Sequence, residues 1–335
     1  MTTSVERYRW LDILKFFGIF LVAFGHIYTN EEVLQWLYTF HVPLFFVAGG
    51  VVYRPREIWE DIRRRAFKIL VPYFLFGLLI LLYYYFIERQ FRDVQVGFLQ
   101  GLSGLFIGDM QHLEFHSHLW FLPCYFITSI VYNILYKLLK PIGCYIACGA
   151  ATLAYALLPI PSLPWGIDRM CGFLGLFALG HIAAEKKLTE KAAALPVSAK
   201  LACAAVVIGI SVALSIFGLT DGLLWIVCAI VGTVGFSLLS MAIDRANLIA
   251  RIGGMNLLAL CVHGPIYRVL LKIVSMLLDT TTDAIRADVL ISLAVTAVTL
   301  AVCCAGHLLL EKIMPWSIGI SPQKHRSIQE KKTSE

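Results

Sequence analysis

The amino-acid sequence predicts an all-α integral membrane protein, a bundle of about ten transmembrane helices with cytoplasmic N- and C-termini. Three observations support this fold class: the composition, the lengths of the apolar segments and the distribution of basic residues. Of the 335 residues, 59% are hydrophobic and only 15% are charged, whereas a soluble domain carries about 25% charged residues. An apolar excess of this size cannot be buried inside one globule, so lipid must surround much of the surface.

A helix needs about 20 mostly apolar residues to cross the hydrocarbon core of a bilayer. Ten segments of the sequence meet this requirement or come close to it, although the second is short and the ninth is interrupted by Gly264-Pro265. These segments are residues 10–28, 38–53, 69–87, 119–139, 142–159, 167–184, 201–219, 223–243, 253–278 and 287–310. They leave two long connections, a basic one at 54–68 and a glycine- and histidine-rich one at about 88–118.

The positions of Lys and Arg predict the orientation, because cytoplasmic loops of membrane proteins carry an excess of both. With the N-terminus inside, the inner segments contain 21 Lys and Arg residues and the outer loops only 3. We expect one membrane domain at 1–315, followed by a polar cytoplasmic tail at 316–335. The net charge of +6 gives no reason to expect a nucleic-acid partner, and membrane lipid is the expected surrounding.

The first predicted helix carries ionisable groups along one face. Asp12, Lys15, Ile19, Val22 and His26 are spaced by three or four residues and therefore form one stripe. A charged side chain inside a bilayer costs about 2.5–3.5 kcal/mol on insertion scales, and it usually faces the bundle interior or a water-filled cavity. Asp12 and Lys15 either form an ion pair that fixes helix packing or take part in the function. For His26 we favour a functional role.

A basic cluster precedes the third helix. It consists of Arg63, Arg64, Arg65 and Lys68. Such a cluster can set the topology and contact anionic lipid, each cation contributing about 1 kcal/mol near the surface. It can also hold the phosphate groups of a nucleotide-like ligand. Composition alone favours the first role.

Further histidines gather on the predicted outer side. His41 opens the second helix, and His112, His116 and His118 lie in the long outer loop with H-x-x-x-H-x-H spacing. This spacing can bind a metal ion, but it would require helical and extended conformations within one short segment, so we predict no metal site. The nine cysteines all lie in apolar runs and are interpreted as packing residues rather than disulfide or zinc-binding residues.

Two more residues are candidates for the outer side. Trp120 lies where an aromatic belt is expected. His263 precedes Gly264-Pro265, and such a break frees backbone groups to line a cavity.

Five motifs occur in a fixed order along the chain. They are Arg9-x-x-Asp12-x-x-Lys15 running on to Gly25-His26, the segment Phe40–Phe46, Arg65-x-x-Lys68 ahead of Val71-Pro72-Tyr73, the segment His118–Leu122, and His263-Gly264-Pro265. In this order and topology the sequence resembles the acyltransferase-3 family of membrane O-acyltransferases over about residues 7–315. Around Leu11–Lys15, Phe40–Gly50 and Trp120–Cys124 it is most similar to the fucose 4-O-acetylase-like subgroup.

The resemblance implies an acyltransferase of the bacterial inner membrane. It would move an acyl group, by the resemblance an acetyl group, from cytosolic acyl-CoA to a hydroxyl of a glycan or lipid-linked sugar at or beyond the outer face. Acyl-CoA is then the donor substrate, and no bound cofactor is expected.

The resemblance also implies roles for individual residues. His26 takes the catalytic position, and Lys15 stands in place of the usual arginine, which keeps the charge but loses bidentate geometry. Arg65 and Lys68 match a basic pair near the donor. Gly49 stands where serine is usual.

These roles predict a path through the protein. The basic cluster would hold the CoA phosphates, the thioester arm would pass Lys15, and His26 would act either as a general base or as a transiently acylated nucleophile. The acceptor side would be shaped by His41, His118, Trp120 and His263. Two other functions fit the same charges: a transporter or flippase of a glycan or small solute, and a non-catalytic membrane partner in polysaccharide assembly or modification.

Overall fold

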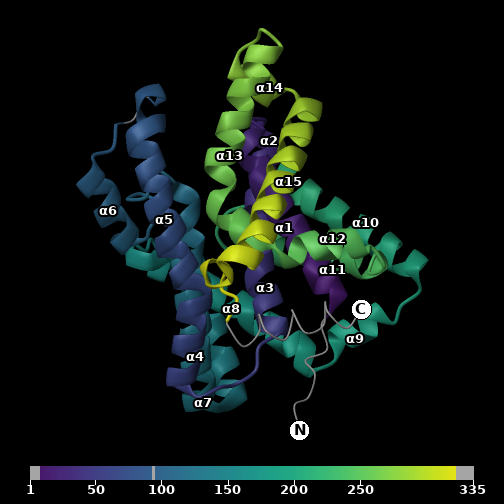
Figure 1. Ribbon diagram of the computed structural model, residues 1–335. Coiled ribbons are helices and arrows are strands. Elements are labelled where there is room, and N and C mark those ends of the chain that lie inside the picture. The colour runs from purple at the N-terminus through teal and green to yellow at the C-terminus, as the bar shows by residue number, and fades with distance from the viewer. Residues whose placement is uncertain (1–7, 93–94, 322–335) are drawn as a thin grey trace, which may run out of the picture.

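The computed structural model describes residues 8–92 and 95–321, and every regular element within these ranges is a helix (Figure 1). Nine segments of the described chain are long and apolar enough to cross a membrane. They are Arg9–Ile27, Glu31–Val51, Ile58–Phe91, Ser117–Leu157, Pro164–Glu185, Val197–Ile216, Leu223–Ala242, Asn256–Leu277 and Val289–Ile313. The predicted all-α membrane bundle is confirmed. Below, "inner" and "outer" denote the ends assigned by the Lys and Arg distribution.

One of the nine segments folds back on itself. Helix α7, Phe121–Leu157, is interrupted at Lys140, whose φ of 57° is not helical. Tyr132 from the first arm and Tyr145 from the second both lie near Nδ1 of His181, with oxygen–nitrogen distances of 2.8 and 3.5 Å. The arms therefore run side by side and correspond to the two predicted spans on either side of residue 140. The nine segments make ten crossings.

The second span begins at Glu31, not at residue 38, and it bends in the middle. It consists of α2, Glu31–Phe40, and α3, Pro43–Val51. The acidic residues of its first turn lower the apolar signal in the sequence, yet they are favourable at the positive end of the helix dipole. Asn30 caps this turn by accepting a hydrogen bond from the backbone N–H of Val33 at 3.0 Å.

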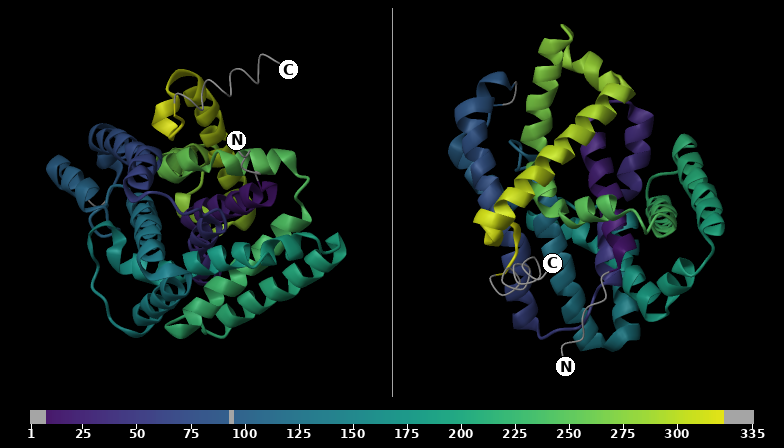
Figure 2. Two further views of the ribbon diagram at one scale, coloured as in Figure 1. Left: turned by 90° about the horizontal axis from the view of Figure 1, so that it is seen from below. Right: turned by 45° about the vertical axis from the view of Figure 1, so that its right-hand side comes forward.

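Helix α1, Arg9–Ile27, lies at the centre of the bundle (Figures 1 and 2). Within its apolar window 67% of the residues are buried, against 22% in the peripheral helix α10, Val197–Ile216. Helix α12, Asn247–Gly254, crosses α1 in close contact, since a Cβ at Gly253 would overlap the carbonyl oxygen of Asp12. The ionisable stripe of α1 is thus enclosed by other helices rather than by lipid.

Helices α3 and α8, Ile167–Glu185, touch through their backbones. A Cβ at Gly50 would overlap the carbonyl oxygen of Phe177, and a Cβ at Gly180 would overlap that of Val47. Small residues at helix interfaces allow this close approach in a membrane, where van der Waals packing replaces the hydrophobic effect as the driving force.

The basic cluster leads into a π-helical turn. Helix α4, Ile58–Arg65, continues through η1, Ala66–Leu70, into α5, Val71–Tyr83. Pro72 has no N–H to donate to the carbonyl of Lys68 four residues earlier, and the wider turn accommodates it without breaking the helix. The backbone of Lys68 packs against Gly319, whose φ of 72° and lack of a Cβ permit the contact.

The predicted outer loop at 88–118 contains short helices rather than open coil: η2, Tyr84–Glu88; η3, Arg89–Phe91; α6, Phe98–Ile107; and η4, Ser117–Trp120. Later elements are η5, Pro164–Gly166; α9, Leu188–Ala193; α11, Leu223–Ala242; α13, Asn256–Leu277; α14, Thr282–Ala287; α15, Val289–Ile313; and η6, Pro315–Ile318. Ser317 and Ile318 are buried, so packing continues beyond the expected domain end at 315. The remainder of the predicted tail, 322–335, and Arg7 lie outside the described residues.

We expect Gly50→Ala to lower the stability of the bundle by about 1–3 kcal/mol, as overpacking does, because its methyl group would collide with the backbone of Phe177. Gly149→Ala is the matched control, since no atom lies within 4 Å of its Cβ position. Thermal unfolding in one detergent, followed by a thiol-reactive dye that labels the cysteines as they become exposed, compares the two. Equal midpoints would contradict the close contact of α3 with α8.

Candidate functional site

A cavity of about 470 Å³ opens beside the outer end of α1. It brings together the proposed catalytic histidine and every residue predicted for the acceptor side: His26, His41, His118, Trp120 and His263. They come from four separate parts of the chain, since α1, the α2–α3 bend, η4 and α13 each contribute. The residues that the sequence analysis assigned to the acceptor side thus lie together with His26 in one cavity.

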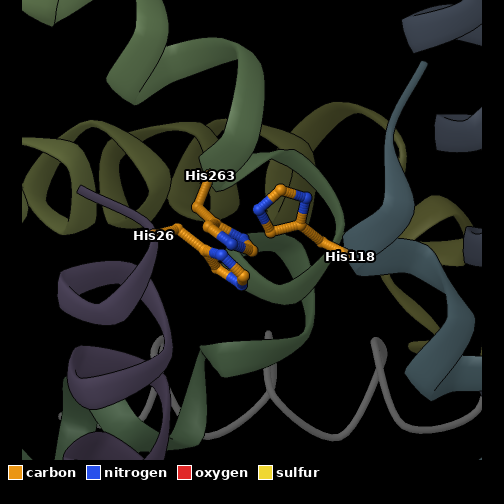
Figure 3. A group of neighbouring side chains, drawn as sticks. All are labelled: His26, His118 and His263. Atoms are coloured by element: carbon orange, nitrogen blue, oxygen red, sulfur yellow. The ribbon is translucent and has the colours of Figure 1, made fainter. Parts of the chain in front are cut away.

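Three imidazole rings converge in this cavity (Figure 3). The centroid of the His26 ring lies 3.8 Å from that of His118 and 5.6 Å from that of His263, and the last two are 4.8 Å apart. One nitrogen atom of each ring can be chosen so that all three lie within 4.8 Å of one another. We call His26, His118 and His263 the histidine triad.

Hydrogen bonds fix the tautomer of one member of the triad. A carbonyl oxygen only accepts, so Nδ1 of His263 carries the proton that it donates to the carbonyl of Ala259 at 2.7 Å. This leaves the lone pair of Nε2 free, and that atom is buried without a hydrogen-bond partner in the described chain. Both ring nitrogens of His118 are buried without such a partner as well. The triad thus offers unpaired nitrogen atoms to whatever occupies the cavity.

His116 lies behind the triad. Its Nε2 donates to the carbonyl of Cys261 at 2.8 Å, and its ring stacks on that of His118 at 4.8 Å. Burial, and after it the positive charge of Arg268, lowers the pKa of His116 well below its ordinary value. His116 is therefore a neutral spacer between the triad and Arg268.

An ion-pair network beyond His116 balances the charge of Arg268. Nε of Arg268 lies 2.7 Å from one carboxylate oxygen of Glu88, and Nη2 donates to the other oxygen at 3.1 Å. Arg92 contacts the same carboxylate at 3.0 Å. The sequence analysis did not assign a role to this pair. The sequence feature that could have indicated this pair is the presence of charged residues within or next to apolar spans.

A second cavity, of about 250 Å³, lies further along the same helix beside Lys15. Nζ of Lys15 pairs with Oδ1 of Asp12 at 2.5 Å, so the predicted ion pair is present. Tyr125 and Asn256 also line this cavity. A Cβ at Gly49 would overlap the Tyr125 hydroxyl, which therefore occupies the place that a serine side chain at position 49 would need.

Three side chains separate the two cavities. Phe45, Phe121 and Leu260 line both the Lys15 cavity and the triad cavity. We call these three residues the septum. The two cavities therefore lie next to each other along α1 and share these residues in their walls.

The basic cluster lies outside the Lys15 cavity. Arg63 and Arg64 are exposed, and Nε of Arg65 pairs with Oδ2 of the fully buried Asp61 at 2.9 Å. Arg63 borders a separate shallow groove on the outside of α4 and α5. From this segment it is Ile69, next to Lys68, that reaches the wall of the Lys15 cavity.

The histidine spacing in the outer loop does not describe one site. The His112 side chain is 52% exposed, and its Nδ1 lies 2.7 Å from Oδ1 of Asp109. Only His118 of the three loop histidines joins the triad, with partners from α1 and α13. Within residues 8–92 and 95–321, the triad is the one group of three or more potential metal ligands that lie this close together.

Aromatic residues form much of the triad cavity wall. The guanidinium carbon of Arg169 lies 4.5 Å from the centroid of the Trp120 ring, as in a cation–π contact. Phe173 stacks on Trp120 and makes an edge contact with Trp225. The sequence analysis missed Arg169 and Trp225, because nothing in the order of the spans shows which helices enclose one cavity.

Comparison with known proteins identifies the family of the chain. The family model of acyltransferase-3, an acyltransferase domain, matches residues 8–308, a range that contains both cavities. The chain belongs to the acyltransferase-3 family. This acyltransferase-3 protein is therefore a multi-pass membrane enzyme that transfers acyl groups other than amino-acyl groups. No curated protein and no solved structure gives a significant match.

Removing the charge of Glu88 should destabilise the enzyme strongly. Glu88→Gln leaves the guanidinium of Arg268 uncompensated, and its side chain is only 18% exposed. Breaking a buried pair costs about 3–5 kcal/mol. The control is Glu60→Gln, which breaks the exposed Arg56–Glu60 pair at a cost of about 0.3–0.5 kcal/mol. Thermal midpoints measured in one detergent should fall far more for the first variant. Similar midpoints would contradict a structural role for the Glu88–Arg268 pair.

Proposed function

We propose that this acyltransferase-3 protein transfers an acetyl group, or another short acyl group, from cytosolic acyl-CoA to a hydroxyl group of a glycan or lipid-linked sugar. The acceptor lies at the outer face of a bacterial inner membrane. One observation carries the proposal: the Lys15 cavity and the triad cavity lie next to each other on α1 and share the septum residues in their walls. This arrangement suits two substrates that approach from opposite sides of the membrane.

The donor occupies the inner side in this proposal. Its thioester arm lies in the Lys15 cavity, where the ammonium group of Lys15 is available to the carbonyl oxygen and Asn256 offers further hydrogen bonds. The exposed guanidinium groups of Arg63 and Arg64 hold the CoA phosphates at the inner surface. Because the cavity does not extend to these arginines, they act on the nucleotide end of CoA and not on the thioester.

The acceptor occupies the triad cavity. A sugar presents several hydroxyl donors, and the free lone pair of His263 Nε2 and the unpaired nitrogens of His118 are suitable acceptors for them. Trp120, Phe173 and Trp225 give the cavity broad apolar faces, against which the C–H faces of a sugar ring can pack.

His26 acts as a general base in this proposal. Its imidazole takes the proton of the acceptor hydroxyl as the oxygen attacks the thioester carbonyl. When the tetrahedral intermediate collapses, the C–S bond breaks and the imidazolium returns that proton to the departing thiolate of CoA. The products are an O-acyl ester and CoA thiol, and His26 is neutral again.

The septum has to open for the two substrates to meet. Phe45, Phe121 and Leu260 line both cavities, and in this proposal rotamer changes of these three residues join them. When the septum is closed, it keeps water on the acceptor side away from the thioester and so prevents hydrolysis.

The proposal is tested with purified protein in liposomes and acetyl-CoA labelled in the acetyl group. We expect release of CoA thiol and transfer of the label to glycan or lipid-linked sugar, together with loss of O-acetyl groups from surface glycans in cells that lack the protein. Label that crosses the membrane as intact acetyl-CoA, or a glycan profile unchanged by the loss of the protein, would overturn it. The likeness to the fucose 4-O-acetylase-like subgroup remains a prediction about the acceptor.

Replacement of His26 by Gln should lower kcat for acyl transfer about 10²–10⁴-fold, the usual contribution of a general base. The control is His112→Ala, because His112 is exposed and pairs with Asp109 outside the triad cavity; its rate should match wild type. Equal yields and thermal midpoints show that both variants fold. Full activity of His26→Gln would refute the assignment, and a stable acyl group on His26 in quenched reactions would replace the general base by a nucleophile.

Replacement of Lys15 by Met should raise the KM for acyl-CoA about ten- to a hundredfold, since a hydrogen bond to a charged group contributes about 1.5–3 kcal/mol. The KM for the acceptor should not change, because Lys15 lines only the inner of the two cavities. Lys15→Arg keeps the charge and should restore most of the donor affinity. Equal increases of both KM values would show that Lys15 acts through the packing of α1 rather than on the donor.

A further inference from the structure

The histidine triad has the ligand set of a transition-metal site. Three imidazoles from α1, η4 and α13 point toward one another (Figure 3), with one nitrogen of each ring within 4.8 Å of the others. Tetrahedral zinc with Zn–N bonds of about 2.0–2.1 Å places its ligand nitrogens about 3.4 Å apart. The two nitrogens that lie furthest apart would have to approach each other by little more than about 1 Å, a movement that side-chain rotation can provide.

The protonation pattern of His263 is the one that ligating histidines have. Its Nδ1–H is held by the carbonyl of Ala259, and this leaves Nε2 as the atom that faces its neighbours. Histidines that bind metal usually donate their second ring N–H to a carbonyl or carboxylate in this way. His263 itself is 1% exposed, so its unpaired Nε2 lone pair is a buried acceptor that needs a partner.

Local charges do not exclude a cation. Arg268, behind the triad, pairs with Glu88, whose carboxylate also contacts Arg92, and the carboxylate of Asp168 lies 3.8 Å from Arg169 on the other side of the cavity. His41 donates its Nδ1–H to the carbonyl of Leu37. The cavity itself provides an open fourth position, as in metal sites with three protein ligands.

We propose that His26, His118 and His263 bind a divalent transition-metal ion of the zinc type, and that the bound ion inhibits the enzyme. The inhibition follows because the bound ion occupies the lone pair of His26. His26 needs this lone pair to accept the proton of the acceptor hydroxyl. Metal binding stands on the geometry of the triad alone, whereas the inhibition rests on the proposed function.

Cobalt provides a readout that does not depend on activity. Purified wild-type protein, freed of metal with a chelator, is titrated with Co²⁺ alone, and the visible absorption of tetrahedral Co²⁺ is recorded. We expect one Co²⁺ per chain, displaced by Zn²⁺. The band should disappear in each of the variants His26→Ala, His118→Ala and His263→Ala. It should persist in His112→Ala, which removes the histidine of the alternative loop spacing.

A folding defect is separated from a lost ligand in two ways. His118→Asn and His263→Asn keep side chains of similar polarity and are tested beside the alanine variants. Zn²⁺ should raise the thermal midpoint of wild type and of His112→Ala, since a ligand that binds only the native state stabilises it, but not that of any triad variant. A wild-type protein without a Co²⁺ band, or a band that survives in the triad variants, overturns the metal site.

The inhibition is measured separately with the labelled donor. Micromolar Zn²⁺ should abolish acyl transfer by wild type, and a chelator should restore it. A Co²⁺ band with undiminished transfer in saturating Zn²⁺ overturns the inhibition. A Co²⁺ band in a protein that transfers no acyl group under any condition supports the metal site and counts against the proposed function instead.

Discussion

The high cost of placing ionisable side chains in hydrocarbon determines the position of α1. Asp12, Lys15 and His26 lie on one face of a helix that crosses the membrane, and each would be unfavourable against lipid. The bundle therefore encloses this helix, which is far more buried than α10. Gly253 brings α12 against the backbone at Asp12, and the Lys15 ammonium is neutralised within one turn of its own helix. Both cavities follow from this enclosure, because polar groups that avoid lipid need water or ligand on their remaining side.

The two cavities differ in how they carry charge. The inner one contains a full ion pair, whereas the outer one contains imidazoles and places its arginines opposite carboxylates. Imidazoles are suited to proton transfer because they can accept a proton and return it near neutral pH. The septum is apolar, so its side chains offer no hydrogen bonds to either set of polar groups. A division of this kind allows one helix to serve two different chemical environments eleven residues apart.

Sequence reasoning located the spans and named five residues that line the triad cavity, and its omissions have physical causes. Apolar length and basic loops were sufficient for ten crossings, and the stripe on α1 was visible because helical periodicity is local. The start of α2 was missed because its acidic first turn is stabilised by the helix dipole, which hydropathy does not register. The meeting of His26 with His263 depends on the packing of α1 against α13, which no local pattern encodes. Arg65 pairs with Asp61 on its own helix. The sequence shows only the charge of Arg65, and this charge did not reveal that the side chain lies outside the Lys15 cavity.

The contact between Gly319 and Lys68 fixes the position of the last described residues. The backbone of the π-helical turn before Pro72 contacts Gly319, which has a left-handed backbone conformation and no side chain. The last described residues therefore lie beside Lys68, at the end of the basic cluster that we propose for the CoA nucleotide. A fluorophore attached at position 321 would lie near this segment, and its emission would report donor binding there.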